Sequence, residues 1–165
     1  MECVADASIL IDLNDGRILD VLSGMSDRFY VPDVVVAELD EPDGATLKRA
    51  GLRPESLPGE AVVEVMRLTH EERRISVEDA SALVLAERTK RVLLTGDRRL
   101  RELAQKRGVA VHGTLWLLER MVAAGALTRR RAAEALEKML ECDRRLPESE
   151  ARSLIHRWRA AKEGE

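Results

Sequence analysis

The sequence predicts an α/β fold in which a parallel sheet lies between two layers of helices, a three-layer α/β/α sandwich. Its 165 residues fit one domain, since domains average about 150 residues. Over residues 1–125, short apolar segments alternate with helical patterns, which is typical of a parallel sheet with helices on both faces. From Thr128 onward the pattern is helical only. We therefore expect residues 126–165 to form a helical extension that packs on the domain or serves association.

Five short runs of aliphatic and β-branched residues are predicted to be the strands of this sheet. They are residues 3–5, 28–31, 61–68, 92–94 and 109–111. Pro32 ends the second run and is expected to open a helix through Leu39, because proline is favoured at first helical positions. The β-branched residues Val34, Val35 and Val36 favour a strand over the same segment, so both interpretations stay open.

Helices are expected between these strands and after the last of them. They are one that begins at residues 7–8, a short one at 46–50, longer ones at 77–90, 98–107 and 114–124, and two in the C-terminal extension. The short helix lies in an irregular connection, residues 40–60, that is rich in proline and glycine. The last helix carries Leu154, Ile155 and Trp158, which either complete the core or form an interface.

Composition indicates a globular protein without a membrane span. Hydrophobic residues make up 45% of the chain and charged residues 35%. The longest stretch without Asp, Glu, Lys or Arg, residues 108–118, is much shorter than the roughly 20 apolar residues of a membrane span. With no secretion signal at the start, a cytoplasmic location is expected. Cys3 and Cys142 lack CxxC spacing, which excludes a zinc knuckle.

The net charge does not identify a partner by itself. It is −3, from 30 acidic and 27 basic residues. Of the basic residues 22 are Arg, whose planar guanidinium suits bidentate phosphate contacts, but a GC-rich genome would give the same bias. With two Trp, one Tyr and one Phe, a stacking platform for single-stranded nucleic acid is not expected.

Four acidic residues occupy positions where an α/β sheet binds its ligands, beyond the carboxyl ends of the strands. They are Asp6 after the first strand, Glu38 on the helix after the second, Asp79 at the start of a helix, and Asp97 after residues 92–94. Three of them also have a structural explanation. Asp6 and Asp97 are suitable helix N-caps, and Asp79 has capping-box spacing from Ser76.

Helical spacing distinguishes two of these acids from ordinary caps. Asp79 lies on the same helix face as Leu83, and Glu38 lies on the same face as Val34 and Val35. An acid on an apolar face is costly unless a cation or a metal pairs with it. No Lys or Arg has suitable spacing on these two faces, so both acids are expected to be partly buried ligands.

A group of carboxylates without cysteine favours Mg²⁺ or Mn²⁺ over Zn²⁺, because these hard cations prefer oxygen ligands. His70, His112 and His156 have no HxxxH or HxH relation. A carboxylate-held Mg²⁺ in an α/β fold is typical of phosphate chemistry. The chain has no GxxxxGK[ST] or GxGxxG motif, which disfavours nucleotide-binding ATPases and dinucleotide-binding folds.

The residues around the four acids resemble the motifs of PIN-domain ribonucleases, which include the VapC-type toxins of toxin–antitoxin pairs. The matching segments are Val4-Ala5-Asp6-Ala7-Ser8, Val31-Pro32 with Val36-Ala37-Glu38-Leu39, Val77-Glu78-Asp79-Ala80-Ser81-Ala82, Leu93-Leu94-Thr95-Gly96-Asp97 and Val109-Ala110-Val111-His112-Gly113-Thr114. The resemblance covers about residues 1–125. The sequence departs from the family pattern at Gly96, where small or polar variation is expected to be harmless.

The resemblance implies a PIN-like sandwich with an acidic Mg²⁺ or Mn²⁺ centre that cleaves RNA and leaves 5′-phosphate and 3′-hydroxyl ends. The catalytic metal ligands implied by the match are Asp6, Glu38, Asp79 and Asp97. Ser8 and Thr95 would orient these carboxylates. Family members are often homodimers, and the toxins bind an antitoxin protein, so both are expected partners besides the RNA substrate.

Arg98, Arg99 and Arg101 follow the last of these acids and are candidate RNA contacts. The alternative is a solvated helix face on which Arg98 pairs with Glu102. Two other functions were compared with the ribonuclease. One is a catalytically silent PIN-like module that binds RNA or a protein. The other is a haloacid dehalogenase-type phosphatase, which needs a second Asp where this sequence has Ser8.

Overall fold

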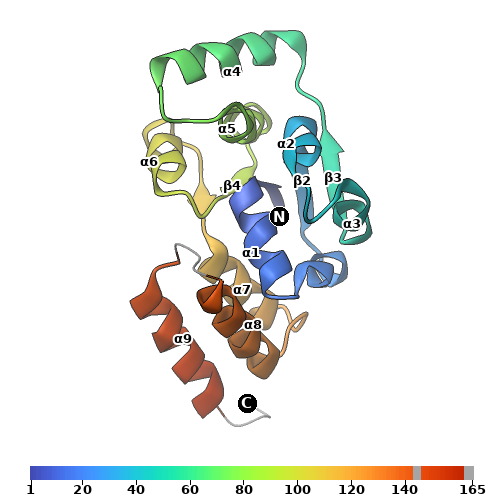
Figure 1. Cartoon of the computed structure of the whole chain (residues 1–165), viewed down its shortest axis with the longest axis vertical. Coiled ribbons are helices and arrows are strands. Elements are labelled where there is room, and N and C mark those ends of the chain that lie inside the picture. The colour runs from blue at the N-terminus through green and yellow to red at the C-terminus, as the bar shows by residue number, and fades with distance from the viewer. Residues whose placement is uncertain (143–145, 162–165) are drawn as a thin grey trace.

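A five-stranded parallel sheet forms the centre of the structure (Figure 1). The structure is a computed structural model and describes residues 1–142 and 146–161. The strands are β1 (Glu2–Ala5), β2 (Arg28–Pro32), β3 (Leu52–Glu55), β4 (Val92–Leu94) and β5 (Val111–His112), in the order β3-β2-β1-β4-β5. Each pair of neighbouring strands is parallel. The predicted α/β fold is confirmed.

Helices connect the strands and form the C-terminal part of the chain. They are α1 (Ala7–Asp15), the 3-10 helix η1 (Leu19–Gly24), α2 (Asp33–Glu38), α3 (Gly44–Arg49), α4 (Gly59–Glu71), α5 (Val77–Thr89), α6 (Arg98–Lys106), α7 (Thr114–Ala123), α8 (Arg129–Glu141) and α9 (Glu148–Ala160). Among the described residues, no helix has the length and apolar character needed to cross a membrane.

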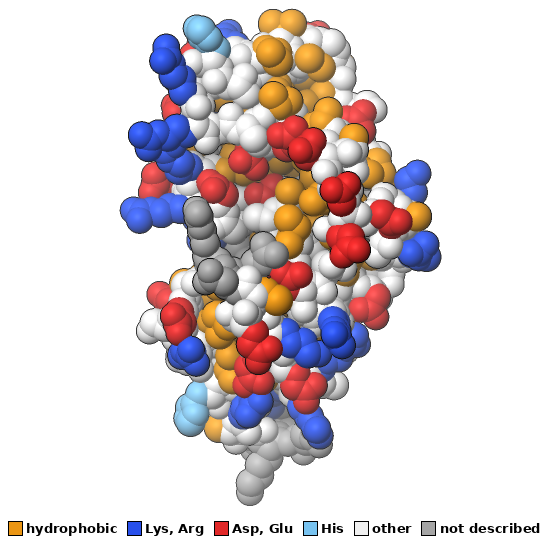
Figure 2. Space-filling view, viewed as in Figure 1, with side chains coloured by type: hydrophobic (Ala, Val, Ile, Leu, Met, Phe, Trp, Pro, Cys, Tyr) orange, Lys and Arg blue, Asp and Glu red, His pale blue; other side chains and the backbone are white. Residues whose placement is uncertain are grey.

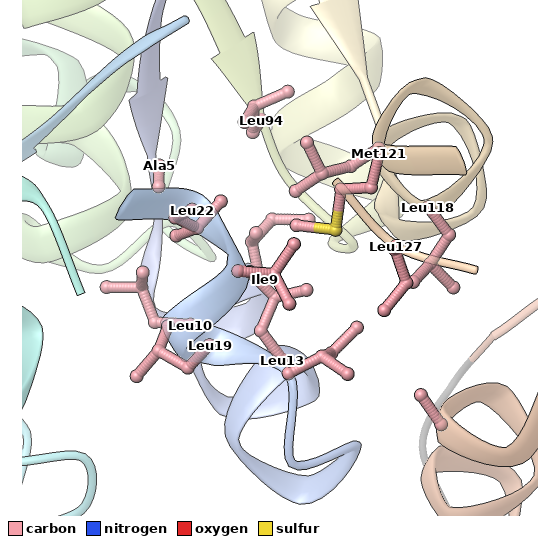
Figure 3. Packing of buried hydrophobic residues seen from close by; sticks show 14 of the residues in the cluster. Ala5, Ile9, Leu10, Leu13, Leu19, Leu22, Leu94, Leu118, Met121 and Leu127 are labelled. Carbon is pink, nitrogen blue, oxygen red and sulfur yellow. The ribbon is translucent and has the colours of Figure 1, made fainter. Parts of the chain in front are cut away.

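The sheet separates two hydrophobic cores, because successive side chains of a strand point to opposite faces. Cys3 and Ala5 of β1 belong to a core with residues of α1, α7, α8 and α9, whereas Val4 belongs to a core with residues of α4, α5 and α6. The neighbouring strand β4 repeats this division, with Leu94 in the first core and Leu93 in the second. Figure 3 shows the first core, where side chains of α1 lie against those of α7. The strands and helices therefore form three layers.

Residues 61–68 form part of helix α4, so the prediction of a strand there is wrong. Ala61, Val65 and Leu68 are buried against α5, at the spacing of one helix face. Val62 and Val63 lie on the other side and are exposed. The β-branched content favoured a strand, but the apolar residues that pack recur with the helical period.

The connection between residues 40 and 60 contains a strand that was not predicted. β3 pairs with β2 at the edge of the sheet and includes Pro54, which an edge strand tolerates because its outer N–H groups need no partner. The proline and glycine content obscured this strand. Residues 33–38 are helix α2, so the helix opened by Pro32 is the correct interpretation, and β5 begins at Val111 rather than at residue 109.

The helices of the C-terminal extension pack onto the domain, at its lower end in Figure 1. Leu136 and Met139 of α8 are fully buried in the core that contains α1. α9 packs on α8, and Leu154 and Trp158 are buried there. These residues complete the core, whereas the use of the extension for association stays a prediction.

A buried ion pair joins the start of β2 to α7. The side chain of Asp27, directly before β2, is 3% exposed. Arg120 donates to both of its carboxylate oxygens at 2.7 Å, and the Met1 ammonium group donates to Oδ1 at 2.9 Å. Hydrogen bonding by Arg120 lowers the pKa of Asp27 to about 2. The carboxylate is therefore charged and paired at all moderate pH values.

We expect Arg120→Ala to lower the free energy of unfolding by about 2 kcal/mol or more, because a buried carboxylate then loses its guanidinium partner. Urea denaturation at neutral pH measures the effect. The difference from the parent should shrink as the pH falls from the unfolded pKa of 3.8 to about 2, where Asp27 becomes protonated. Arg130→Ala is the matched control, since the Arg130 side chain is 78% exposed in its pair with Glu134. Equal stability of the two variants would contradict this role of the pair.

Candidate functional site

The carboxyl ends of β1 and β4 lie side by side at the centre of the sheet. Ala5 is the register partner of Leu94, and the backbone N–H of Asp6 donates to the carbonyl of Leu94 at 3.1 Å. The next residues along the two strands, Asp6 and Thr95, are therefore brought together although they are far apart in the sequence. This edge is where ligands bind in open α/β sheets.

The carboxylate of Asp6 is almost fully held by the protein. Asp6 is 1% exposed and is the N-cap of α1. Its Oδ1 accepts from Ser8 Oγ at 2.6 Å and from the N–H of Ile9 at 3.0 Å, and its Oδ2 accepts from Thr95 Oγ1. A carboxylate oxygen has about two lone-pair sites. Oδ1 is thus saturated, and Oδ2 retains one lone pair for a further ligand.

The two hydroxyl groups on Asp6 also fix the loop after β4. The N–H of Gly96 donates to Ser8 Oγ at 2.8 Å, and the N–H of Asp97 donates to Thr95 Oγ1 at 3.0 Å. Asp97 in turn is the N-cap of α6, where its Oδ1 accepts from the N–H of Leu100 at 2.8 Å. Ser8 and Thr95 thus both hydrogen-bond to Asp6, and their role in orienting metal ligands stays a prediction.

Three aspartates influence one another electrostatically at this edge. Burial raises the pKa of Asp6 to about 6, against the lowering effect of its hydroxyl donors, and the charge of Asp79 raises it further. Burial also raises the pKa of the half-buried Asp79, and the charge of Asp97 adds to that rise. Figure 2 shows acidic side chains gathered around a hollow, which Figure 1 places between α2, α5 and α6 near the start of α1.

Asp79 is positioned by the start of α5. Ser76 is the N-cap of this helix and accepts from the N–H of Asp79 at 3.0 Å. The expected burial of the face that carries Asp79 is observed, because Leu83 and Ala86 are fully buried. The capping explanation is therefore confirmed, because Ser76 holds the first turn of the helix. Asp79 also interacts electrostatically with Asp6 and Asp97, and its role as a metal ligand stays a prediction.

Glu38 differs from the expectation, because it is exposed. It was expected on an apolar stripe with Val34 and Val35, but Val34 is 37% exposed and only Val35 is buried on α2. A helix of 6 residues completes fewer than two turns, so its buried face is narrower than the sequence pattern suggested. The prediction of a partly buried Glu38 is wrong, and its role as a ligand stays a prediction.

The donor chemistry fits a hard divalent cation, since the residues at this edge offer carboxylate oxygens and hydroxyls. In residues 1–142 and 146–161, however, no group of three or more His, Cys, Asp or Glu side chains is already spaced to hold a metal ion. Asp6 has one free lone pair, and repulsion among Asp6, Asp79 and Asp97 is the cost that a cation would relieve. Binding would require side chains to turn toward the ion.

A buried acid that the sequence reading missed lies beside this centre. Asp12 of α1 is 5% exposed and accepts from Thr114 Oγ1 of α7 at 2.6 Å. A Cβ atom added to Gly96 would lie 3.8 Å from Asp12 Oδ2, so this carboxylate is next to the loop after β4. The available signal was an acid inside the apolar run between Ile9 and Leu13.

The three arginines of α6 have different surroundings. Arg98 is 90% exposed and pairs with Glu102 at 2.9 Å, as the solvated-face interpretation predicted, and Arg99 is exposed. Arg101 is half-buried, and its Nη2 donates to the backbone carbonyl of Thr95 at 3.1 Å. Within the described part of the chain, Arg101 is thus the one of the three that contacts the loop after β4.

Comparison with known proteins identifies a family and similar solved structures. Residues 2–160 match the family model DUF3368, described as a PIN domain. The structure of a PilT N-terminus domain protein from the hyperthermophilic archaeon Sulfolobus solfataricus is similar, with a TM-score of 0.50 over 73% of this chain and 92% of that chain at 14% sequence identity. This second similarity supports the fold alone. A comparison with curated proteins gave no match.

We expect Asp6→Asn to stabilise the fold at neutral pH when metal is chelated. Asp6 binds its proton more tightly in the folded protein, with a pKa of about 6, than in the unfolded chain at 3.8, so its charge destabilises the fold increasingly as the pH rises between these values. The pKa difference corresponds to at most roughly 3 kcal/mol at neutral pH. The net gain is smaller, because the Asn amide nitrogen cannot accept the hydrogen bond that Thr95 donates to Asp6. Urea denaturation in EDTA from pH 4 to 8 measures it.

The control for this measurement is Asp20→Asn, since the Asp20 side chain is 75% exposed. The stabilisation by Asp6→Asn should be small near pH 4 and largest above pH 6. A stability difference that does not change over this range would show that the buried charge is not the cause.

Proposed function

Because the chain belongs to the PIN-domain family, we propose that it is a Mg²⁺- or Mn²⁺-dependent endoribonuclease that hydrolyses RNA phosphodiesters. The observation that carries the proposal is the buried carboxylate of Asp6, which keeps one free lone pair and interacts electrostatically with Asp79, itself coupled to Asp97. Perturbed carboxylates at the ligand-binding edge of an α/β sheet are typical of functional sites. Membership of the VapC-type branch stays a prediction.

The metal would be held by Asp6, Asp79 and Asp97, with Glu38 as the further ligand implied by the family resemblance. When bound, Mg²⁺ or Mn²⁺ supplies a Lewis acid that activates water and offsets the charge of the scissile phosphate. Without that positive charge, the three aspartates repel the phosphates of RNA. We therefore expect RNA binding at this site to depend on the cation.

The hydroxyl groups of the site act as orienting groups rather than as nucleophiles. Ser8 and Thr95 each donate their hydroxyl proton to Asp6 and each accept a backbone N–H from the loop after β4. Neither oxygen is activated by a separate base, as a nucleophilic hydroxyl would need to be. Because these donors fix the plane of the Asp6 carboxylate, its free lone pair has one direction before any ligand arrives.

A second function is favoured by two specific observations. The described residues contain no group of side chains already spaced for a metal, and Glu38 is exposed. Both are features of a PIN-like module that binds RNA or a protein without cutting it. The cleavage assay below separates this binding function from the ribonuclease.

We expect purified protein to cleave RNA in the presence of Mn²⁺, to stop in EDTA, and to leave 5′-phosphate ends. Asp6→Asn and Asp79→Asn should each lower the rate by more than about 100-fold, since even the outer partners of metal ligands contribute 10- to 100-fold. Asp20→Asn, on η1, should cleave at the parent rate. Gel analysis of end-labelled RNA and ligation that requires 5′-phosphate measure these results.

Two outcomes would reject the ribonuclease assignment. One is cleavage that persists in both Asp6→Asn and Asp79→Asn, which would indicate a contaminating nuclease or another site. The other is binding of RNA without cleavage by the parent protein at any Mn²⁺ concentration, which would establish the silent module.

A further inference from the structure

The guanidinium group of Arg101 lies between the carboxyl ends of β4 and β5. Its Nη2 donates to the backbone carbonyl of Thr95 at 3.1 Å, and the backbone N–H of Thr95 donates to the carbonyl of His112 in β5 at 2.9 Å. Burial lowers the pKa of His112, and the charge of Arg101 adds to this lowering. The backbone of Thr95 is thus held by β5 through its N–H and by Arg101 through its carbonyl.

Gly113 provides the space that this guanidinium occupies. Its backbone is extended, with φ −113° and ψ −174°, a conformation that any residue adopts. A Cβ atom added there would lie 2.3 Å from Arg101 Nη2, with the next atom outside Arg101 at 3.5 Å. A side chain at residue 113 would therefore displace the Arg101 guanidinium, while the backbone conformation itself would accept one.

Arg101 is placed to hold the loop after β4 rather than to bind a ligand through its Nε. Its Nε is fully buried and has no hydrogen-bond partner in the described part of the chain. A buried donor without a partner is unfavourable, so the other contacts of the guanidinium must offset this cost. Arg98, in contrast, points into solvent and is 90% exposed.

We infer that Arg101 is a positioning residue for the aspartate centre, acting through Thr95. Thr95 Oγ1 contacts both the Asp6 carboxylate and the N–H of Asp97, so the position of the Thr95 backbone determines where both acids lie. This inference rests on the proposed function for its effect on catalysis. The contact with Thr95 itself exists whether or not the protein cleaves RNA.

The test is a double-mutant cycle between Arg101→Ala and Gly113→Ala. The methyl group of Gly113→Ala meets the mobile end of Arg101, so this substitution displaces the guanidinium while residue 101 stays arginine. Each single variant should lower kcat for Mn²⁺-dependent RNA cleavage by about 10- to 100-fold, the usual effect of small displacements at reacting groups. KM should change less than about twofold. The double variant should be no slower than Arg101→Ala, because both substitutions remove the same contact, the one between Arg101 and the Thr95 carbonyl.

Two further variants test this result, one as a partial rescue and one as a control. Arg101→Lys retains a charged donor and should recover part of the lost kcat. Arg152→Ala removes an exposed arginine of α9 that pairs with Glu148, away from the aspartates, and should leave kcat unchanged.

A second readout does not need activity. Hydrogen exchange of the Asp97 amide reports on its bond to Thr95 Oγ1, and exchange of the buried α5 amides serves as the internal reference. We expect Asp97 exchange to accelerate in Arg101→Ala and in Gly113→Ala, without a further increase in the double variant. An equal acceleration in α5 would indicate general destabilisation and overturn the inference.

The remaining outcomes also decide the matter. Additive losses in the cycle, an unchanged kcat in Arg101→Ala, or a loss confined to KM would each overturn the positioning role, the last in favour of direct RNA contact. If the parent protein cleaves no RNA, the proposed function fails, and the exchange cycle alone upholds or overturns the role of Arg101.

Discussion

The hydrogen bond between Thr95 and Asp6 is the contact on which the rest of this site depends. It joins residues from two neighbouring central strands, and both residues are buried. The hydroxyl groups of Ser8 and Thr95 hold both Asp6, the N-cap of α1, and the backbone N–H groups of the loop after β4. Without this bond, the Thr95 hydroxyl would no longer link the Asp6 carboxylate to the Asp97 amide, although the sheet would still form.

The cost of this arrangement is a buried negative charge. Burial raises the pKa of Asp6 to about 6, so at neutral pH the carboxylate is ionised in surroundings that disfavour its charge. A site of this kind lowers the stability of the apoprotein in exchange for affinity toward a cation. The overall charge of −3 conceals this local concentration of acid. A bound divalent cation would offset most of the local negative charge that an RNA phosphate meets.

Sequence reasoning predicted the features that depend on local pattern. The alternation of short strands and helices, the strand-end position of Asp6, and the buried face beside Asp79 all follow from residues close together in the chain. It failed where tertiary packing decides. α4 resembles a strand in composition, and β3 carries the proline expected of a loop. Asp12 is buried and accepts a hydrogen bond from Thr114 of α7, 102 residues away in the sequence.

Gly96 and Gly113 both leave space that a neighbouring side chain occupies. Comparison of motifs alone does not reveal this. A Cβ atom at Gly96 would lie 3.3 Å from Ser8 Oγ, close enough to displace the hydroxyl that orients Asp6. A side chain there would require Ser8 to move by a few tenths of an ångström, and the expectation that variation at Gly96 is harmless stays a prediction. Gly113 leaves space for Arg101 in the same way. Neither glycine has a positive φ, so the backbone conformation does not require glycine at these positions. Close approaches of neighbouring side chains favour glycine there. A family motif that lists only the acids does not include these contacts.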